Sequence, residues 1–315
     1  MSTQYKLGSA ASTQVAGTLQ EGLINGPASV ASFSYPSVIA SDTKGNIFVA
    51  DRGTNVIRKI SVSGDVSTFA GSGAIGNDDG MGAQASFRLI KGLAVDTAGN
   101  LYVSDYCRIR KISPTGLVTT IAGSPIQGYR DDQDTLARFG WVKGLCVDRV
   151  GNIYVGDNFD TYSYIRKITP SGQVTTWAGS TKGNNEGSIQ VAKFEYIWDV
   201  VINATGDLII SDFGNMAVRK ATAAGQVSTI YKMDAIATYL TVDKNGTVYF
   251  NGGGVGFGLL TGASTVFRII NGAWERIAGD FVAGHKDGDG LQARFRGWGL
   301  SIDTEGNILV ADREN

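Results

Sequence analysis

A sequence unit recurs along the chain, and this repetition restricts the possible folds more than any other feature. The segment GLAVDTAGNLYVSDYCRIRKISPTGLVTTIAGS (92–124) returns as GLCVDRVGNIYVGDNFDTYSYIRKITPSGQVTTWAGS (144–180). Related segments lie at 38–72, 200–231, 238–279 and 300–315. Such internal repeats predict an architecture of similar units, each of which packs on its neighbours.

Each unit has the pattern of four short strands. An apolar run is followed by a turn of the form Asp-x-x-Gly-Asn, an alternating run such as LYVSD, a loop, IRKI, a Gly turn and VTTIAG. β-branched and aromatic residues between turn signals favour a β-meander over a helix. A four-stranded sheet buries both of its faces when several such sheets stand radially around an axis, so the repeat predicts a β-propeller.

The two ends of the chain predict how the ring closes. The C-terminal segment GLSIDTEGNILVADREN (299–315) contains only the two inner strands of a unit, and QYKLGSAASTQVAG (4–17) resembles two outer strands. We therefore predict an all-β fold, a six-bladed β-propeller of four-stranded antiparallel blades, as one domain over residues 1–315. The blades are expected at 36–71, 91–123, 143–179, 197–231, 237–279, and 298–315 together with 4–17. Pairing of the N-terminal outer strands with the C-terminal inner strands removes the open edges.

The connectors between units share a second pattern, in which a Gly/Asp loop precedes Ala-x-Phe. An acid or amide lies eight residues before each Phe, and we interpret it as the N-cap of a helical turn whose Phe fills the gap between blades. The capping candidates are Asn25, Asp79, Asp131, Glu186 and Asp287, and the aromatic residues are Phe33, Phe87, Phe139, Phe194 and Phe295.

With its "AG" motif, Gly/Asp loop and Ala-x-Phe, the repeat resembles the NHL-repeat family of propellers over nearly the whole chain. The resemblance implies the propeller fold and leaves the function open. NHL-like and related six-bladed propellers include binding modules, lyases and lactonase-like hydrolases.

The spacing of Gly71, Gly73 and Gly76 matches a dinucleotide-binding loop, but no βαβ unit surrounds these residues. We therefore interpret the glycines as turn residues.

The net charge of −1 and the absence of a long Lys/Arg run argue against nucleic acid as a partner. No apolar run is long enough for a membrane span or a signal peptide. Cys107 and Cys146 lie in unlike contexts, which predicts two unpaired thiols.

Polar residues that recur in every unit are expected to serve the architecture. The first group consists of Asp42, Asp96, Asp148, Asp243 and Asp303, with Asn203 as a variant, and is predicted to cap hairpin turns. The second group, Asp51, Asp105, Asp157, Asp212 and Asp312, is predicted to bind local backbone or Arg58, Arg110, Arg166, Arg219 and Arg268. The connector aspartates could also supply oxygen ligands for Ca²⁺, although their spacing lacks a full calcium loop and favours capping. We expect no other cofactor, and the single His285 is interpreted as a polar loop residue.

Function is therefore sought where the units differ, at the residues that follow each connector Phe. In propellers of this topology these residues surround the mouth of the central channel on the face that usually binds ligands, called the top face below. Aromatic rings mixed with Lys and Arg suit sugars or carboxylates; packing between blades is the alternative. The candidate ligand-binding residues are Tyr35, Ser37, Lys91, Trp141, Lys143, Tyr196, Trp198, Asp199, Arg296 and Trp298.

Two decorated loops extend this prediction. DNFDTYSY (157–164) adds Phe159, Tyr162 and Tyr164 to the top face, and the long Gly-rich loop 251–265 adds Phe257. The unit at 238–279 also has a short connector, and Asp199 and Asp234 are the carboxylates outside the repeat pattern that are best placed to act in chemistry.

These features support three functional hypotheses. The first is a non-catalytic recognition module that binds a glycan or a protein or peptide ligand around the channel mouth, with no catalytic residues. The second is a metal-dependent lactonase-like hydrolase or lyase with its site at the same mouth, although the inner strands lack the carboxylates and histidines of such metal sites. The third is a scaffold disc in a larger assembly; otherwise a monomer is expected. Low Lys content and abundant Gly, Ser and Thr slightly favour an extracellular or cell-surface location.

Overall fold

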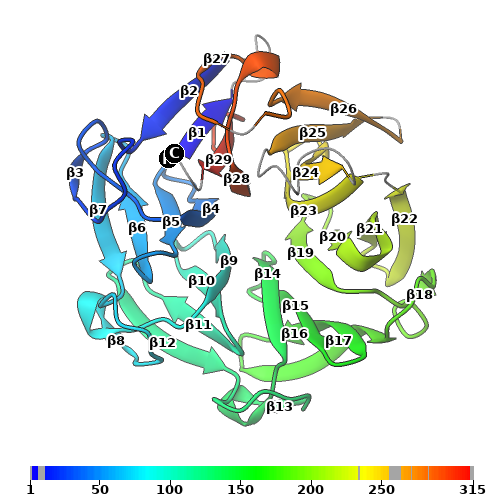
Figure 1. Cartoon of the computed structure of the whole chain (residues 1–315). Helices are drawn as coiled ribbons and strands as arrows, with labels where there is room; N and C mark the ends of the chain where they lie inside the picture. Colours follow the sequence, from blue (N-terminus) through cyan, green and yellow to red (C-terminus); the bar gives the residue numbers. More distant parts are fainter. Residues whose placement is uncertain are drawn as a thin grey trace.

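The chain forms an all-β propeller, as the repeats predict (Figure 1). The structure is a computed structural model and describes residues 2–5, 11–232, 235–254, 264–270, 272–282 and 284–312. Its strands form six antiparallel sheets, numbered 1 to 6 below, which is consistent with a six-bladed propeller. No helix among these residues is long and apolar enough to cross a bilayer.

Each sheet is ordered from the strand at the outside of the ring to the strand nearest its axis. Sheet 1 contains β3 (Gly26–Pro27), β7 (Asp65–Ala70), β6 (Val56–Ile60), β5 (Ile47–Asp51) and β4 (Pro36–Ser41). Sheet 2 contains β8 (Gly80–Met81), β12 (Leu117–Ala122), β11 (Arg108–Ile112), β10 (Leu101–Asp105) and β9 (Ile90–Val95). Sheet 3 contains β13 (Asp132–Gln133), β17 (Gln173–Thr181), β16 (Tyr162–Ile168), β15 (Ile153–Phe159) and β14 (Trp141–Val147).

The other three sheets complete the ring. Sheet 4 contains β18 (Gly187–Ser188), β22 (Gln226–Lys232), β21 (Ala217–Ala221), β20 (Leu208–Asp212) and β19 (Ile197–Ile202). Sheet 5 contains β26 (Ala273–Ala278), β25 (Thr265–Ile270), β24 (Val248–Gly254) and β23 (Ala235–Val242). Sheet 6 contains β27 (Gly288–Asp289), β2 (Ala11–Ala16), β1 (Ser2–Tyr5), β29 (Ile308–Asp312) and β28 (Gly297–Ile302). The described residues also include one-turn 3-10 helices at Gly82–Gln84, Asp134–Leu136, Phe213–Asn215 and Gly290–Gln292.

The inner strands surround a central axis. Each contacts the next in the cyclic order β4, β9, β14, β19, β23, β28 and back to β4. Sheet 6 joins the two ends of the chain, because β1 pairs with both β2 and β29, with Thr3 opposite Gln14 and Val310. The N-terminal strands thus complete the sheet begun by the C-terminal strands.

Five sheets carry an additional two-residue strand that the sequence reasoning did not predict. In each case the connector that leads into a sheet pairs with the outer strand of that same sheet, as β8 does with β12. Sheet 5 has four strands, and no such additional strand occurs among the described residues of the short connector before β23. The added strand covers the exposed edge of the sheet.

The predicted role of the connector acids and amides as N-caps is wrong. The residue at the N-cap of the 3-10 helix Gly82–Gln84 is Met81, and that of the helix Asp134–Leu136 is Gln133. Neither helix has a side-chain cap hydrogen bond. Asp79 instead binds the guanidinium of Arg110 at 2.7 Å and the backbone N–H and hydroxyl of Thr120. Asn25, Asp131, Glu186 and Asp287 likewise bind a buried Arg, the outer strand, or both. The predicted residues do not cap because their side chains reach a cation or a strand edge instead. The 3-10 helix Gly290–Gln292 does have a side-chain cap, but the cap is Asp289, two residues after the predicted Asp287.

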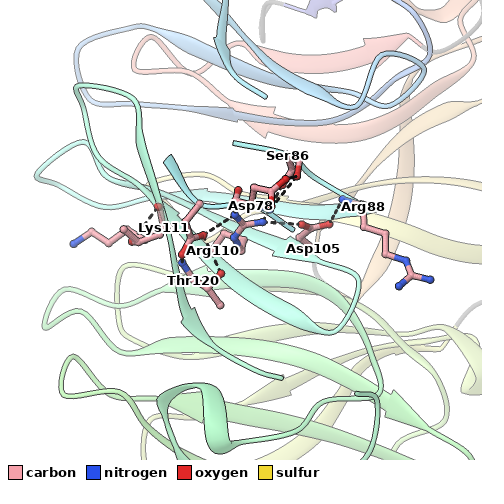
Figure 2. Close-up of polar contacts among 9 residues, drawn as sticks. Asp78, Ser86, Arg88, Asp105, Arg110, Lys111 and Thr120 are labelled. Atoms are coloured by element: carbon pink, nitrogen blue, oxygen red, sulfur yellow. Dashed lines mark hydrogen bonds and ion pairs between the residues drawn. The ribbon is translucent and has the colours of Figure 1, made fainter. Parts of the chain in front are cut away.

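The predicted pairing of the second aspartate group with the Arg group is confirmed in sheets 1 to 4. Figure 2 shows Arg110 between Asp105 and the connector that contains Asp78 and Ser86. The four Arg–Asp pairs have distances of 2.9 to 3.5 Å and are fully buried. Each Arg also lies over the connector Phe, which is itself buried as predicted. The arginine thereby joins the third strand to the connector.

Sheet 5 departs from this arrangement, and the assignment of Arg268 to the Arg group is wrong. In the strand register, Phe250 opposes Phe267, where Val49 opposes Arg58 in sheet 1. The two phenyl rings stack with centroids 5.1 Å apart. Arg268 lies one residue further along and forms a partly exposed ion pair with Glu275 at 2.7 Å. The segment FRII (267–270) resembles the IRKI of the other units, and this likeness shifted the sequence alignment of the unit by one residue.

The turn and cysteine predictions are confirmed. Asp42 accepts hydrogen bonds from the backbone N–H groups of Lys44 and Asn46, and the other members of this group make equivalent bonds. Cys107 and Cys146 are both free and buried. These features stabilise the scaffold that positions the candidate site.

Candidate functional site: the top-face rim

The rim residues lie where each connector enters an inner strand, so they surround the same end of the channel. The first residue after each connector Phe is fixed by its backbone: its N–H donates to the buried aspartate at the end of the second strand. These residues are Ser34, Arg88, Gly140, Glu195 and Arg296, and their distances to the carboxylate are 2.6 to 2.9 Å. A backbone bond makes no demand on the side chain, so the rim can vary between sheets.

Two rim tyrosines have a left-handed backbone. Tyr35 has a φ of 52° and Tyr196 a φ of 58°, and they hold equivalent positions two residues after Phe33 and Phe194. This conformation is uncommon and unfavourable for non-glycine residues and persists only where the surroundings fix it. Part of the backbone strain of the molecule therefore lies at the candidate site, although other residues such as Asn55 and Met216 share this conformation.

Lys143 forms the centre of a first cluster on the rim. Its Nζ lies 4.3 Å from the ring centroid of Trp198 and 5.0 Å from that of Tyr196. Phe213 stacks on Trp198, with centroids 5.0 Å apart. Lys143 is only 7% exposed, and within the described part of the chain it forms no ion pair. The rings thus hold a nearly buried cation through its attraction to their π-electrons.

Trp298 forms the centre of a second cluster. The guanidinium of Arg52 lies 5.6 Å from the ring centroid, and Nζ of Lys91 lies 5.7 Å from it. Trp298 belongs to sheet 6 and Lys91 to sheet 2, and Arg52 directly follows β5 of sheet 1. Side chains of three sheets therefore meet at one ring.

Other rim rings are more open to solvent. Trp141 is 46% exposed and contacts the edge of Tyr106, whose ring carries the guanidinium of Arg88 at 4.0 Å. Tyr35 is 41% exposed. Ser37, by contrast, is buried and donates to the carbonyl of Ala50, so the structure places it in the packing between strands.

Asp199 lies beneath the rim. Its carboxylate accepts hydrogen bonds from the backbone N–H groups of Val200 and Leu240 at 2.9 and 2.8 Å. Burial raises the pKa of Asp199 to about 7, against the lowering effect of these two bonds. Gly144 makes room for it, since a Cβ there would come within 1.7 Å of Oδ1. Asp199 thus joins the inner strands of sheets 3, 4 and 5.

A cavity of about 350 Å³ occupies the channel on the other side of Asp199. It is lined by the second halves of all six inner strands, including Asp199, Cys146 and Tyr239. Most rim residues, among them Lys91, Lys143 and Trp298, do not line it. Burial raises the pKa of the Cys146 thiol well above its usual value, which keeps the thiol protonated. Rim and cavity are two separate regions of the channel.

The remaining candidates are dispersed. Tyr162 stacks on Tyr164, which stacks on Tyr129, with centroid distances of 5.6 and 4.6 Å. Phe159 opposes Tyr162 in the same hairpin and is half-buried. Arg296 is half-buried on the rim. Phe257 and Asp234 lie outside the described residues. Among the residues the structure describes, no group of three His, Cys, Asp or Glu side chains could hold a metal ion.

Sequence reasoning missed Arg52, Tyr106 and Phe213, which support the rim rings. These residues directly follow the second-strand aspartates Asp51, Asp105 and Asp212. The loops between second and third strands open on the top face, and this position in the repeat was the available signal. Tyr239 was also missed; it contacts the edge of Trp198 at a centroid distance of 6.2 Å.

Comparisons with known proteins place the chain among β-propellers. No protein-family profile matches it. It is 26% identical over 224 residues to human Teneurin-4, a match that covers 62% of this chain and 8% of that protein. The chain therefore corresponds to a small part of this relative.

Two solved structures share the fold at low sequence identity. A protein of unknown function from Bacteroides thetaiotaomicron has a TM-score of 0.68 at 16% identity, with 100% of this chain and 74% of that chain covered. A gluconolactonase from Xanthomonas campestris has a TM-score of 0.59 at 11% identity, with 99% and 95% covered. The chain is thus a β-propeller similar to a segment of a teneurin and to lactonase propellers.

Proposed function

We propose that the chain is an NHL-like, six-bladed propeller domain that acts as a non-catalytic recognition module. Its ligand is a glycan or a segment of another protein, bound on the top face around the channel mouth. The observation that carries this proposal is the convergence of rings and cations from different sheets at one end of the channel, above all at Trp298 and at Lys143. These are positions at which the repeats differ.

The division between fixed backbone and variable side chains supports the proposal. The buried aspartates hold the rim backbone in the same way in five sheets, while the side chains attached to it range from Gly140 to Arg296. Binding residues on a rigid scaffold are pre-organised, which lowers the entropic cost of association. A rim of this kind can change its ligand without a change in fold.

The experiment is a binding screen of the whole chain against a glycan array and a library of peptides. Trp141→Ala removes the most exposed rim tryptophan, and Trp274→Ala is the matched control, since Trp274 is 50% exposed on the outer strand β26. We expect Trp141→Ala to weaken the binding of a hit at least about tenfold and the control to leave it unchanged. Hits that bind both variants equally well would contradict a ligand site at this rim.

One observation favours the alternative of a lactonase-like hydrolase or lyase. Asp199 lines the channel cavity with a pKa of about 7, a value suited to proton transfer at neutral pH. Lactone hydrolysis that is lost on Asp199→Asn, with binding at the rim unaffected, would support this alternative.

A further inference from the structure

We propose that the ligand of the rim is an extended protein segment with several carboxylates, which the clusters at Lys143 and Trp298 bind by charge. This inference rests on the proposed recognition function and names the chemistry of its ligand. It requires that the rim offers positive charge to a ligand, that the central rings are unavailable for stacking, and that more than one cationic centre exists.

The rim is cationic although the chain as a whole has a net charge of −1. The four residues that follow each connector Phe include Arg88, Lys91, Lys143 and Arg296, against the single carboxylate of Glu195. Arg52 adds a further cation from the neighbouring loop. Positive potential concentrated at a channel mouth attracts anions and raises their rate of association.

Lys143 is the strongest individual observation. Its side chain is nine-tenths buried, yet its partners are the rings of Tyr196 and Trp198, and it forms no ion pair with any carboxylate in the described ranges. Burying a charge is costly unless a counter-charge is near, and a cation–π contact offsets only part of that cost. A carboxylate from a ligand would complete this site, and it would form a charge-assisted bond in a partly desolvated place.

The ring contacts argue for a peptide over a sugar. A pyranose binds aromatic residues through an open ring face. Phe213 is stacked on Trp198 while Lys143 lies over the same ring, and Trp298 carries both Arg52 and Lys91. The central tryptophans therefore hold cations in place instead of presenting a flat surface.

The two clusters form separate anion-binding centres. Lys143 and Trp198 belong to sheets 3 and 4, whereas Trp298, Arg52 and Lys91 belong to sheets 6, 1 and 2. Tyr239 lies between them: its ring contacts Trp198, and the charge of Arg52 acts on its phenol against the pKa rise caused by burial. Two centres across one mouth match a chain with carboxylates at intervals, and the exposed rings of Trp141 and Tyr35 offer apolar contacts beside them. Acidic motifs are commonly recognised by such cation clusters.

The test uses fluorescence anisotropy with a fluorescein-labelled peptide of alternating Glu and Ser, a matched Gln/Ser peptide, and an oligomer of a uronic acid. We expect the whole chain to bind the Glu peptide more tightly than the other two, and to lose affinity as ionic strength rises. Lys143→Gln and Arg52→Gln are each expected to weaken binding about five- to tenfold. The matched control is Lys167→Gln, because Lys167 lies over Tyr154 at 5.7 Å on the third strand of sheet 3, away from the rim residues.

The outcomes separate the inference from the proposed function. Thermal unfolding confirms that each variant is folded. If Lys143→Gln does not fold, Arg52→Gln tests the inference in its place, because Arg52 is less buried. Binding of the uronic acid alone, or equal binding of Glu and Gln peptides that Trp141→Ala weakens, would overturn the inference and leave the recognition function standing. Absence of rim-dependent binding for every peptide and glycan would remove the proposed function itself.

Discussion

The buried ion pair of sheet 3 allows a quantitative test of what stabilises the ring. Arg166 donates to Asp157 at 2.9 Å, to Asp131 at 2.6 Å, and to two connector carbonyls at 3.0 and 3.1 Å. Asp157 is fully buried, whereas the side chain of Asp131 is 39% exposed. In Arg166→Met, Asp131 can turn to water, but Asp157 cannot.

We expect Arg166→Met to lower the free energy of unfolding by about 3–5 kcal/mol, the usual cost of leaving one partner of a buried pair alone. The melting temperature would fall by roughly 5–10 °C. The measurement is urea-induced unfolding followed by tryptophan fluorescence, after the reversibility of the transition has been verified.

Two further variants identify the cause of this loss. Arg268→Met removes the partly exposed pair with Glu275 and should cost less than about 1 kcal/mol. Arg166→Met combined with Asp157→Ala should be more stable than Arg166→Met alone, because the abandoned carboxylate is the main cost. Equal losses for Arg166→Met and Arg268→Met would refute the reasoning.

Three other predictions concern the channel and the closure. Asp199 has a pKa of about 7 in the folded chain against an ordinary value of 3.8, so it should contribute a loss of about 4 kcal/mol of stability as pH rises from below about 4 to above about 7. The pH-dependent loss in Asp199→Asn, measured from urea unfolding, should be smaller than that of the wild type by this amount, and parallel pH profiles would contradict the prediction. Gly144→Ala places a Cβ 1.7 Å from Oδ1 of Asp199 and should cost at least about 2 kcal/mol, partly recovered with Asp199→Ala in thermal melts. Deletion of residues 2–16 removes β1 and β2 and should abolish the cooperative unfolding transition measured by circular dichroism. Addition of a peptide with the sequence of that segment should restore the transition. An unchanged thermal melt would disprove closure of the propeller by these strands.

The repeat made the strands and their order predictable, because alternation and turn residues act locally. The buried Phe of each connector and the pairing of Arg58 with Asp51 were also predictable, since they recur with the unit. The role of Asp79 was not, because its choice between a nearby N–H and Arg110 depends on how the connector crosses the sheet. Arg268 was misplaced because a one-residue change of register leaves the sequence pattern almost intact.

The candidate site was predictable in location but less so in chemistry. Alignment on the connector Phe located Lys143, Trp198 and Trp298 at one end of the channel, and the structure places them there. The alignment could not show that Lys143 lies over the Trp198 side chain. These residues come from different sheets, and the distance between the sheets is set by the whole propeller. Aromatic residues beside cations suggest stacking surfaces in a sequence, whereas in the structure the cations occupy the rings.

The buried aspartates connect stability to recognition. In sheet 2, Asp105 accepts the N–H groups of Arg88 and Leu89 with one oxygen, and its other oxygen accepts from Arg110. The same carboxylate therefore fixes the rim backbone and ties it to the connector through the arginine. Sheet 5 lacks the pair: Gly252 stands at the position of the aspartate, and the stacked rings of Phe250 and Phe267 provide the stability. Its inner strand instead contributes Tyr239 to the channel, between the two cationic clusters. The sheet that lacks the common Arg–Asp pair is thus the one whose inner strand places a buried tyrosine beneath the rim, in contact with the Trp198 ring.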